Sequence, residues 1–152
     1  MTQEWRRGAY LISTEKSRLD IQVIHNFLTH AYWSEGIPIE TVRRALEHSF
    51  TFGVYHGEQQ VGMARVVTDF TTFAYIADVF ILASFRGQGL GIWLMEVVMA
   101  HPDLQGLRRW VLATKDAHTL YQKVGFTPLQ NPGRFMEKVV PDIYLKGNDP
   151  SQ

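Results

Sequence analysis

The chain has 152 residues, 45% of them hydrophobic, which is enough for one globular domain with its own core. Its 15 Lys and Arg residues balance its 15 Asp and Glu residues, so no broad positive field attracts nucleic acid or an anionic membrane. The chain lacks cysteine, which excludes disulfides, thiolate nucleophiles and cysteine metal sites. Because the N-terminal residues are polar and no apolar run is long enough for a membrane span, we expect a cytoplasmic protein with no nucleic-acid or membrane partner.

Hydrophobic periodicity predicts alternating groups of helices and strands along the chain. The first half is predicted to form a strand, two helices, a hairpin and a third strand, over residues 10–13, 20–32, 39–49, 50–56, 60–67 and 73–82. The second half is predicted to form a long helix ending near residue 101, a strand, a short helix and three further strand-like segments, over residues 110–113, 118–124, 126–129, 134–140 and 142–145. This order predicts a mixed α/β domain with helices on both faces of a sheet.

The segment Arg86-Gly87-Gln88-Gly89-Leu90-Gly91 lies between the third predicted strand and the long apolar helix. Glycines at alternate positions let the backbone turn sharply, so that successive N–H groups point at one anion near the positive end of the helix. We therefore expect a pyrophosphate site. The spacing does not fit the dinucleotide fingerprint G-x-G-x-x-G, and the lysine of the G-x-x-x-x-G-K-[ST] loop is missing.

This segment resembles the pyrophosphate loop of the GNAT N-acetyltransferases, Q/R-x-x-G-x-G/A, through Arg86, Gly89 and Gly91. Residues 120–126, Leu-Tyr-Gln-Lys-Val-Gly-Phe, resemble the second signature of that family, a short helix that carries a tyrosine and ends in Gly-Phe. The resemblance covers nearly the whole chain. It implies acetyl transfer from acetyl-CoA to an amine, without a metal, by one domain over residues 1–146 followed by a flexible tail over residues 147–152.

The resemblance also implies the acyl-CoA N-acyltransferase fold and a set of donor-binding residues. That fold is α/β (α+β), with a mixed, mostly antiparallel sheet of six to seven strands flanked by about four helices on both faces. Backbone groups of the loop are implied to bind the pyrophosphate of coenzyme A, at Arg86, Gly87, Gln88, Gly89, Leu90 and Gly91. The pantetheine arm is implied to lie beside Phe80, Ile81 and Leu82, and an oxyanion donor to lie within residues 79–81. The Arg86 side chain would contact the anion or brace the loop.

One position departs from the family pattern. Many relatives carry an asparagine seven residues before the signature tyrosine, where it contacts pantetheine, and this chain has Thr114 there. A hydroxyl would replace only part of the hydrogen bonding of the amide.

Two residues are candidates for the chemistry of transfer. The resemblance implies that Tyr121 directs its hydroxyl at the sulfur of coenzyme A and protonates the departing thiolate; alternatively it is one more aromatic residue on an amphipathic helix. Asp78 is the only ionisable residue in an apolar strand, and it would accept the proton of the amine directly or through water. It would otherwise be a hydrogen-bonded structural acid or an attractor for a cationic substrate. Weaker candidates are His118, Asp116, which is predicted to cap its helix, and His25.

In this family the loop between the first two helices helps to select the substrate, so the resemblance implies that this loop contacts the acceptor. Tyr32 and Trp33 would form an aromatic wall there and Glu35 would attract an ammonium group, although the two aromatic residues would serve equally well to close the core. Tyr75 and Phe135, with Phe70 and Phe73, would extend an aromatic pocket for a small amine with an apolar portion.

Two other functions fit the same motifs. The chain would also serve as a protein lysine or N-terminal acetyltransferase, or as a module that binds acyl-CoA without catalysis. A homodimer through the last strands is a further expectation, because apolar Phe135, Met136, Val139 and Val140 lie there.

Overall fold

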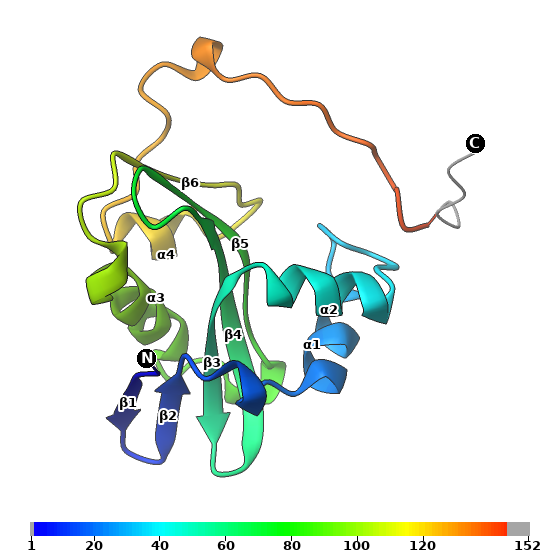
Figure 1. Ribbon diagram of the computed structural model, residues 1–152, viewed down its shortest axis with the longest axis vertical. Helices are drawn as coiled ribbons and strands as arrows, with labels where there is room; N and C mark the ends of the chain where they lie inside the picture. The colour runs from blue at the N-terminus through cyan, green and yellow to red at the C-terminus, as the bar shows by residue number, and fades with distance from the viewer. Residues whose placement is uncertain (1, 146–152) are drawn as a thin grey trace.

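The computed structural model describes residues 2–145 as one sheet with helices on its two faces (Figure 1). The strands are β1 (Glu4–Arg7), β2 (Tyr10–Ser13), β3 (Phe50–His56), β4 (Gln59–Thr68), β5 (Phe73–Ile81) and β6 (Arg109–Leu112). The helices are α1 (Ile21–Leu28), α2 (Ile39–Glu47), α3 (Leu90–Ala100) and α4 (His118–Gln122). This is the mixed, mostly antiparallel α/β sheet with four helices that the sequence predicts; the tail predicted over residues 147–152 lies outside the described residues.

The six strands lie in the order in which they occur along the chain, from β1 to β6. The first five are joined antiparallel, whereas β6 pairs parallel to β5. The parallel ladder is short, because it joins only Phe73–Ile76 of β5 to Arg109–Leu112 of β6. The connection between these two strands carries α3, as a parallel crossover requires.

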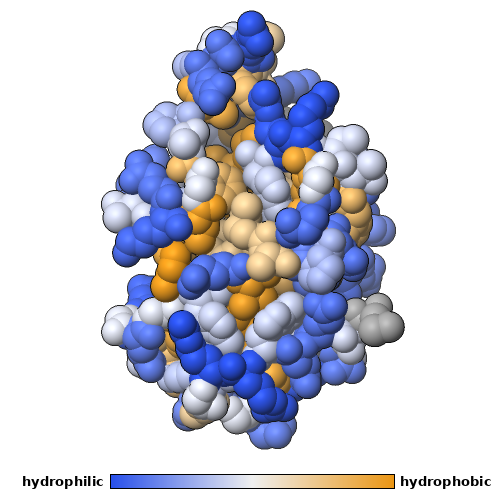
Figure 2. Space-filling model, turned by 90° about the vertical axis from the view of Figure 1, so that its left-hand side faces the viewer, coloured by the Kyte–Doolittle hydropathy of each residue, from blue (hydrophilic) through white to orange (hydrophobic). Residues whose placement is uncertain are grey.

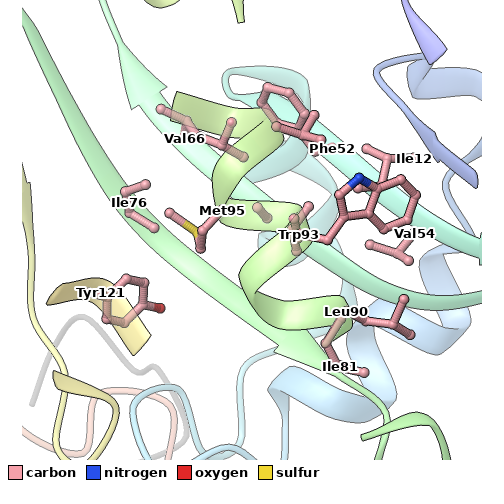
Figure 3. Packing of buried hydrophobic residues seen from close by; sticks show 14 of the residues in the cluster. Ile12, Phe52, Val54, Val66, Ile76, Ile81, Leu90, Trp93, Met95 and Tyr121 are labelled. Carbon is pink, nitrogen blue, oxygen red and sulfur yellow. The ribbon is translucent and has the colours of Figure 1, made fainter. Parts of the chain in front are cut away.

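Two apolar clusters cover the two faces of the sheet. On one face, α3 packs against the middle of the sheet; Leu94, Met95 and Val98 are fully buried there (Figure 3). On the other face lie α1 and α2 (Figure 1), and Met63 and Phe80 of the sheet are buried in the cluster with these helices. Helix α3 is apolar on nearly all sides because it packs against the sheet and also against α4, while α1 and α2 are amphipathic.

The structure corrects several of the predicted elements. Strand β1 was missed because its sequence, Glu-Trp-Arg-Arg, is polar and mostly exposed, and its pairing with β2 is all that makes it a strand. The first helix ends at Leu28 rather than at residue 32, since the chain turns there toward α2. Residues 126–129, 134–140 and 142–145 form no strand, because no other described part of the chain pairs with them. Among residues 2–145, no helix has the length and apolar character needed to cross a membrane.

His101 lies buried at the end of α3, surrounded by the rings of Trp5, Phe50 and Phe52. Its Nδ1 accepts the backbone N–H of Asp103 at 3.0 Å, so Nε2 carries the proton and faces the aromatic rings without an oxygen partner. Burial lowers the pKa of His101, because it removes the water that would stabilise an imidazolium.

This environment makes the stability of the fold depend on pH. A histidine that stays neutral in the fold but takes up a proton in the unfolded chain below about pH 6.5 favours unfolding as the pH falls. We expect the free energy of unfolding to decrease by up to about 1.4 kcal/mol per pH unit between pH 6.5 and the folded pKa. Urea unfolding of His101→Phe should show a flatter dependence, and the exposed His118→Gln should keep that of the wild type. Equal slopes in all three proteins would contradict the assignment.

Candidate active site

The strands β5 and β6 separate halfway along the sheet. Their pairing ends at Ile76 and Leu112, and β5 continues to Ile81 with no strand on that side. The backbone of residues 77–81 therefore offers a free edge to an extended ligand. The predicted pantetheine residues Phe80 and Ile81 lie on this edge, whereas the N–H of Leu82 is already donated to the carbonyl of Val61 at 2.8 Å.

An extra residue in β5 brings two side chains to the same face. Arg65 of β4 pairs with Asp78 and the next residue, Val66, pairs with Ile76, so Ala77 is a bulge. Before the bulge, Ile76 packs in the α3 cluster; after it, Phe80 packs in the α1–α2 cluster. Because the alternation reverses at Ala77, Tyr75 and Asp78 reach the same pocket although three positions separate them.

The glycine loop, residues 86–91, follows β5 and leads into α3. Gly87 and Gly89 both have a φ of 81°, in the left-handed region, and Gly89 is the residue that precedes the first turn of α3. Gly91 lies inside that turn and needs no such conformation; a Cβ there would lie 3.9 Å from the Leu120 side chain. The Arg86 Nε donates to the Ile81 carbonyl at 2.7 Å, so this side chain braces the loop against the end of β5.

The residues present fit the pyrophosphate and the pantetheine arm of coenzyme A. The first N–H groups of the 11-residue helix α3 point into the loop, and the two left-handed glycines expose the backbone to an anion. The free edge of β5 then leads away from this end. Figure 2 shows the molecule from the side of α3 and α4, where apolar side chains gather across the middle of the face and polar ones surround them.

Tyr121 lies on α4 opposite the free edge of β5, and its hydroxyl is turned toward that strand (Figure 3). Gly125, with a φ of 100°, ends the helix, so that the Phe126 N–H returns to the Tyr121 carbonyl at 3.1 Å. The Phe126 ring then packs edge-on against the Tyr121 ring, with centroids 6.0 Å apart. The Gly-Phe signature thus holds the tyrosine in place, and burial, with a smaller contribution from Tyr32, raises the pKa of Tyr121 to about 12. Its hydroxyl remains protonated at neutral pH.

A pocket of about 490 Å³ lies between the α1–α2 loop, β4, β5 and the start of α4. We call it the central pocket, and the residues that matter for its chemistry are Tyr32, Trp33, Arg65, Tyr75, Asp78, Thr114, Tyr121 and Tyr144. It brings together the two predicted catalytic residues with three of the five predicted acceptor residues, from segments far apart in the sequence.

Asp78 is buried in the central pocket and both of its oxygens have partners. Trp33 Nε1 donates to Oδ1 at 2.6 Å, and Arg65 Nε donates to Oδ2 at 2.6 Å. Arg65 in turn donates from a second nitrogen to the Ser49 hydroxyl at 3.1 Å. The carboxylate therefore holds the aromatic wall and the sheet together, whatever else it does.

Tyr32 and Trp33 form a wall of the central pocket rather than closing the core, since they remain 55% and 41% exposed. Their rings meet edge-on with centroids 5.1 Å apart. The Tyr32 hydroxyl accepts the Lys115 N–H at 3.0 Å, which ties the α1–α2 loop to the segment before α4. Thr114, at the departure from the family pattern, lines the same pocket and accepts the Ala117 N–H at 3.0 Å.

The chain is similar to known proteins in both sequence and fold. The family profile described as an acetyltransferase (GNAT) domain matches residues 47–128. The chain belongs to the GNAT acetyltransferase family. A candidate acetyltransferase of Gibberella zeae is 33% identical over 144 residues, covering 80% of each protein. A crystal structure of a candidate GNAT acetyltransferase from Xanthomonas campestris pv. campestris is 50% identical, with a TM-score of 0.87 over 89% of this chain and 96% of that one.

A more distant structure supports the fold. A GNAT acetyltransferase from Elizabethkingia anophelis, solved with acetyl-CoA bound, is 17% identical with a TM-score of 0.63, over 90% of this chain and 91% of that one. The GNAT family uses acetyl-CoA, and this chain is a member of that acetyltransferase family. Within residues 2–145, no three His, Cys, Asp or Glu side chains gather as a metal site would require.

Some predicted residues do not reach the central pocket. Glu35 is exposed outside it, and Phe135 lines a different hollow beyond β6, under the guanidinium of Arg109. Asp116 does not cap α4. The residue before that helix is Ala117, and the Ala117 N–H donates to the Thr114 hydroxyl. His25 is bonded to the Ile37 carbonyl at 3.0 Å, so its ring serves the α1–α2 loop.

Two residues of the central pocket were missed. Arg65 had a signal that could have found it, as the only charge in the otherwise apolar run over residues 60–67. Tyr144 had none, since it enters the pocket from the far end of the chain.

The loop geometry leads to a test of donor binding. Gly89→Ala places a Cβ in the left-handed region, at a cost of about 1–2 kcal/mol, so the loop should leave its anion-binding conformation. We expect the dissociation constant for acetyl-CoA, measured by calorimetry, to rise about tenfold. Gly91→Ala is the matched control, because Gly91 has an ordinary helical conformation and room for a methyl group. Equal affinities for both variants would exclude the glycine loop as the anion site.

Proposed function

We propose that this protein transfers the acetyl group of acetyl-CoA to a primary amine of a small molecule, by direct attack within a ternary complex. The observation that carries the proposal is the central pocket, which places the protonated hydroxyl of Tyr121 and the carboxylate of Asp78 beside the free edge of β5. The acetyl-CoA bound to the Elizabethkingia anophelis relative supports the choice of donor.

The chain would hold the donor mainly through its backbone. The N–H groups of the glycine loop and the first turn of α3 would bind the pyrophosphate, and residues 77–81 would pair with the pantetheine arm. Phe80, Ile81 and Leu82 flank that arm, and the Thr114 hydroxyl replaces part of an amide contact. Bound acetyl-CoA supplies an acetyl thioester whose carbon is open to attack.

The residues of the central pocket would accept one proton and donate another. As the new N–C bond forms and the C–S bond breaks, the amine gives up one proton and the thiolate takes up another. Tyr121 would donate its hydroxyl proton to the departing sulfur. A backbone N–H within residues 79–81 would stabilise the negative charge on the carbonyl oxygen.

Asp78 would act on the amine. Its carboxylate lies on the wall of the pocket beside Trp33, where it would attract an ammonium group and accept a proton from it directly or through water. The ion pair with Arg65 ties down one oxygen and opposes this role, while the second lone pairs of both oxygens remain for a ligand.

The acceptor would be a small amine with an apolar or aromatic portion. Tyr32, Trp33 and Tyr75 present ring faces and edges to the pocket, and such rings favour apolar groups and cations. The same rings are more than a third exposed, and this openness favours a second candidate, acetylation of a lysine or N-terminal amine on a protein.

A screen decides among these functions. Purified protein would be incubated with acetyl-CoA and a panel of small amines and peptides, and free thiol would be followed over time. Turnover restricted to small aromatic or apolar amines would support the proposal, and turnover with peptides alone would replace it with protein acetylation. Binding of acetyl-CoA without any turnover would identify a non-catalytic module.

Removal of the Tyr121 hydroxyl tests the general acid. We expect Tyr121→Phe to lower kcat about 100-fold, the lower end of what a positioned general acid contributes, with the dissociation constant for acetyl-CoA unchanged. Tyr55→Phe is the matched control, because burial raises the pKa of Tyr55 to about 12 as well, but its hydroxyl has no partner and lies away from the central pocket. Wild-type turnover in Tyr121→Phe would remove this residue from the mechanism.

Replacement of the carboxylate tests the general base. Asp78→Asn should lower kcat/KM most at low pH, where most of the amine is protonated and a base is needed most. The measurement is a pH profile of kcat/KM beside thermal unfolding of both proteins. A loss that is uniform in pH and accompanied by a lower Tm would assign Asp78 to the support of Trp33 and Arg65 instead.

A further inference from the structure

Ser49 is a buried serine between α2 and β3, and its hydroxyl has two partners. It donates its single proton to the carbonyl of Ala45, in the last turn of α2, at 2.6 Å. Because the proton is used there, the oxygen meets the rest of the molecule only as an acceptor. It accepts a hydrogen bond from Arg65 Nη1 at 3.1 Å, so a guanidinium from β4 is bonded to the end of α2.

Arg65 makes its second contact with Asp78. Its Nε donates to Oδ2 at 2.6 Å, and only 19% of the Arg65 side chain and 8% of the Asp78 side chain are exposed, so water screens the pair little. The guanidinium is a planar, rigid group whose N–H bonds have fixed directions. A bond to Ser49 from one nitrogen and a bond to Asp78 from another therefore fix both its place and its tilt.

The end of α2 favours this position of the cation. The last carbonyl groups of a helix carry partial negative charge, which attracts a positive group within the last turn. The Ser49 hydroxyl lies between one of these carbonyls, that of Ala45, and the guanidinium of Arg65. A hydroxyl that accepts from a cation becomes a stronger donor, so the two bonds strengthen each other. The end of α2 thus anchors the arginine.

The orientation of Asp78 depends on this anchor. Oδ2 faces Arg65, while Oδ1 accepts the indole N–H of Trp33 at 2.6 Å. A carboxylate without such partners turns readily about its terminal bond. Bonds to both oxygens, from two separate segments, hold its plane, so the lone pairs that remain keep one direction at the wall of the central pocket.

Stability gives only a weak reason for such a pair. Burial of two charges costs desolvation energy, and apolar side chains of similar volume often stabilise a fold as well or better. What the pair supplies, and apolar packing does not, is a fixed direction for a charged group that lines a pocket. The other charged residues of the central pocket, Lys115 and Asp116, are exposed, and neither bonds to Asp78 among the described residues.

We propose that Ser49 and Arg65 are positioning residues of the acceptor site. Ser49 holds the guanidinium of Arg65, and this guanidinium holds the carboxylate of Asp78 in the direction in which it meets the amine. Ser49 lies outside the central pocket, so it would act on the amine only through the other two residues. The effect on acetyl transfer rests on the proposed function, whereas the effect on the orientation of Asp78 does not.

The indole N–H of Trp33 reports on Asp78 without any substrate. The chain has four tryptophans, so a proton–nitrogen NMR spectrum should show four indole signals, and Trp33→Phe identifies the signal of Trp33. We expect Ser49→Ala to shift and broaden this signal, because the oxygen that accepts the indole N–H no longer keeps a single position. Arg65→Lys, which keeps the charge but loses the planar fork, should shift it as well.

Ser13→Ala is the matched control for the NMR measurement. It also removes a buried serine hydroxyl, one that accepts the Glu15 N–H at 3.1 Å and lies outside the central pocket. The Trp33 signal should stay in place in this variant. An unmoved Trp33 signal in Ser49→Ala, or an equal shift in Ser13→Ala, would overturn the proposal.

Kinetic measurements test the link to acetyl transfer. With an amine identified by the screen, Ser49→Ala should lower kcat about tenfold through loss of orientation, with the dissociation constant for acetyl-CoA unchanged. Ser49→Thr keeps the hydroxyl, and its extra methyl group has room because Ser49 lines a second hollow outside the central pocket. This variant should therefore keep the rate of the wild type. Equal losses in the two variants, or a wild-type kcat in Ser49→Ala, would overturn the role in transfer.

The two measurements separate this inference from the proposed function. Absence of turnover with every amine would overturn the proposed function and leave the NMR test in force. Normal turnover by the wild type, together with an unmoved Trp33 signal in Ser49→Ala, would overturn the positioning role alone.

Discussion

The separation of β5 from β6 is the constraint on which the other features of this protein depend. A parallel pair that continued along both strands would satisfy the backbone of β5 and leave no edge for a ligand. Here the pairing stops at Ile76 and Leu112, and the bulge at Ala77 lies next to that point. The bulge reverses the alternation of side chains, so Asp78 and Tyr75 come to one face while Val79 and Ile81 stay in the core.

The helices take their positions from this split sheet. Helix α3 follows β5 through the glycine loop, so its positive end and the left-handed glycines lie at one end of the opening. Helix α4 covers the other strand and brings Tyr121 to the opposite wall, held by the turn at Gly125. In the proposed function, donor binding through backbone groups and chemistry through a few side chains would thus share a single gap in the sheet. Tyr32 and Trp33 form a third wall of this opening. They are held there because Trp33 is bonded to Asp78 and Tyr32 to the Lys115 backbone.

Local patterns predicted most of the fold. Apolar periodicity located α2, β3 and α3 closely, since each of these elements buries a face or a whole surface against its neighbours. The prediction from apolar periodicity was wrong at β1 and after α4, and the cause is the same at both places. An edge strand such as β1 takes its conformation from a neighbour, and the segments after α4 have strand propensity but pair with nothing among residues 2–145.

The sequence by itself determined the family and the local form of the glycine loop and of the turn after Tyr121, because both are short motifs whose geometry follows from a turn and a helix end. Only the tertiary structure decided which side chains meet in the central pocket. Asp78, Arg65 and Trp33 meet across three elements through a bulge that no periodicity reveals, and Tyr144 arrives from the far end of the chain. It also removed Glu35 and Phe135 from the pocket, because proximity between distant segments depends on how the sheet is built and not on residue type.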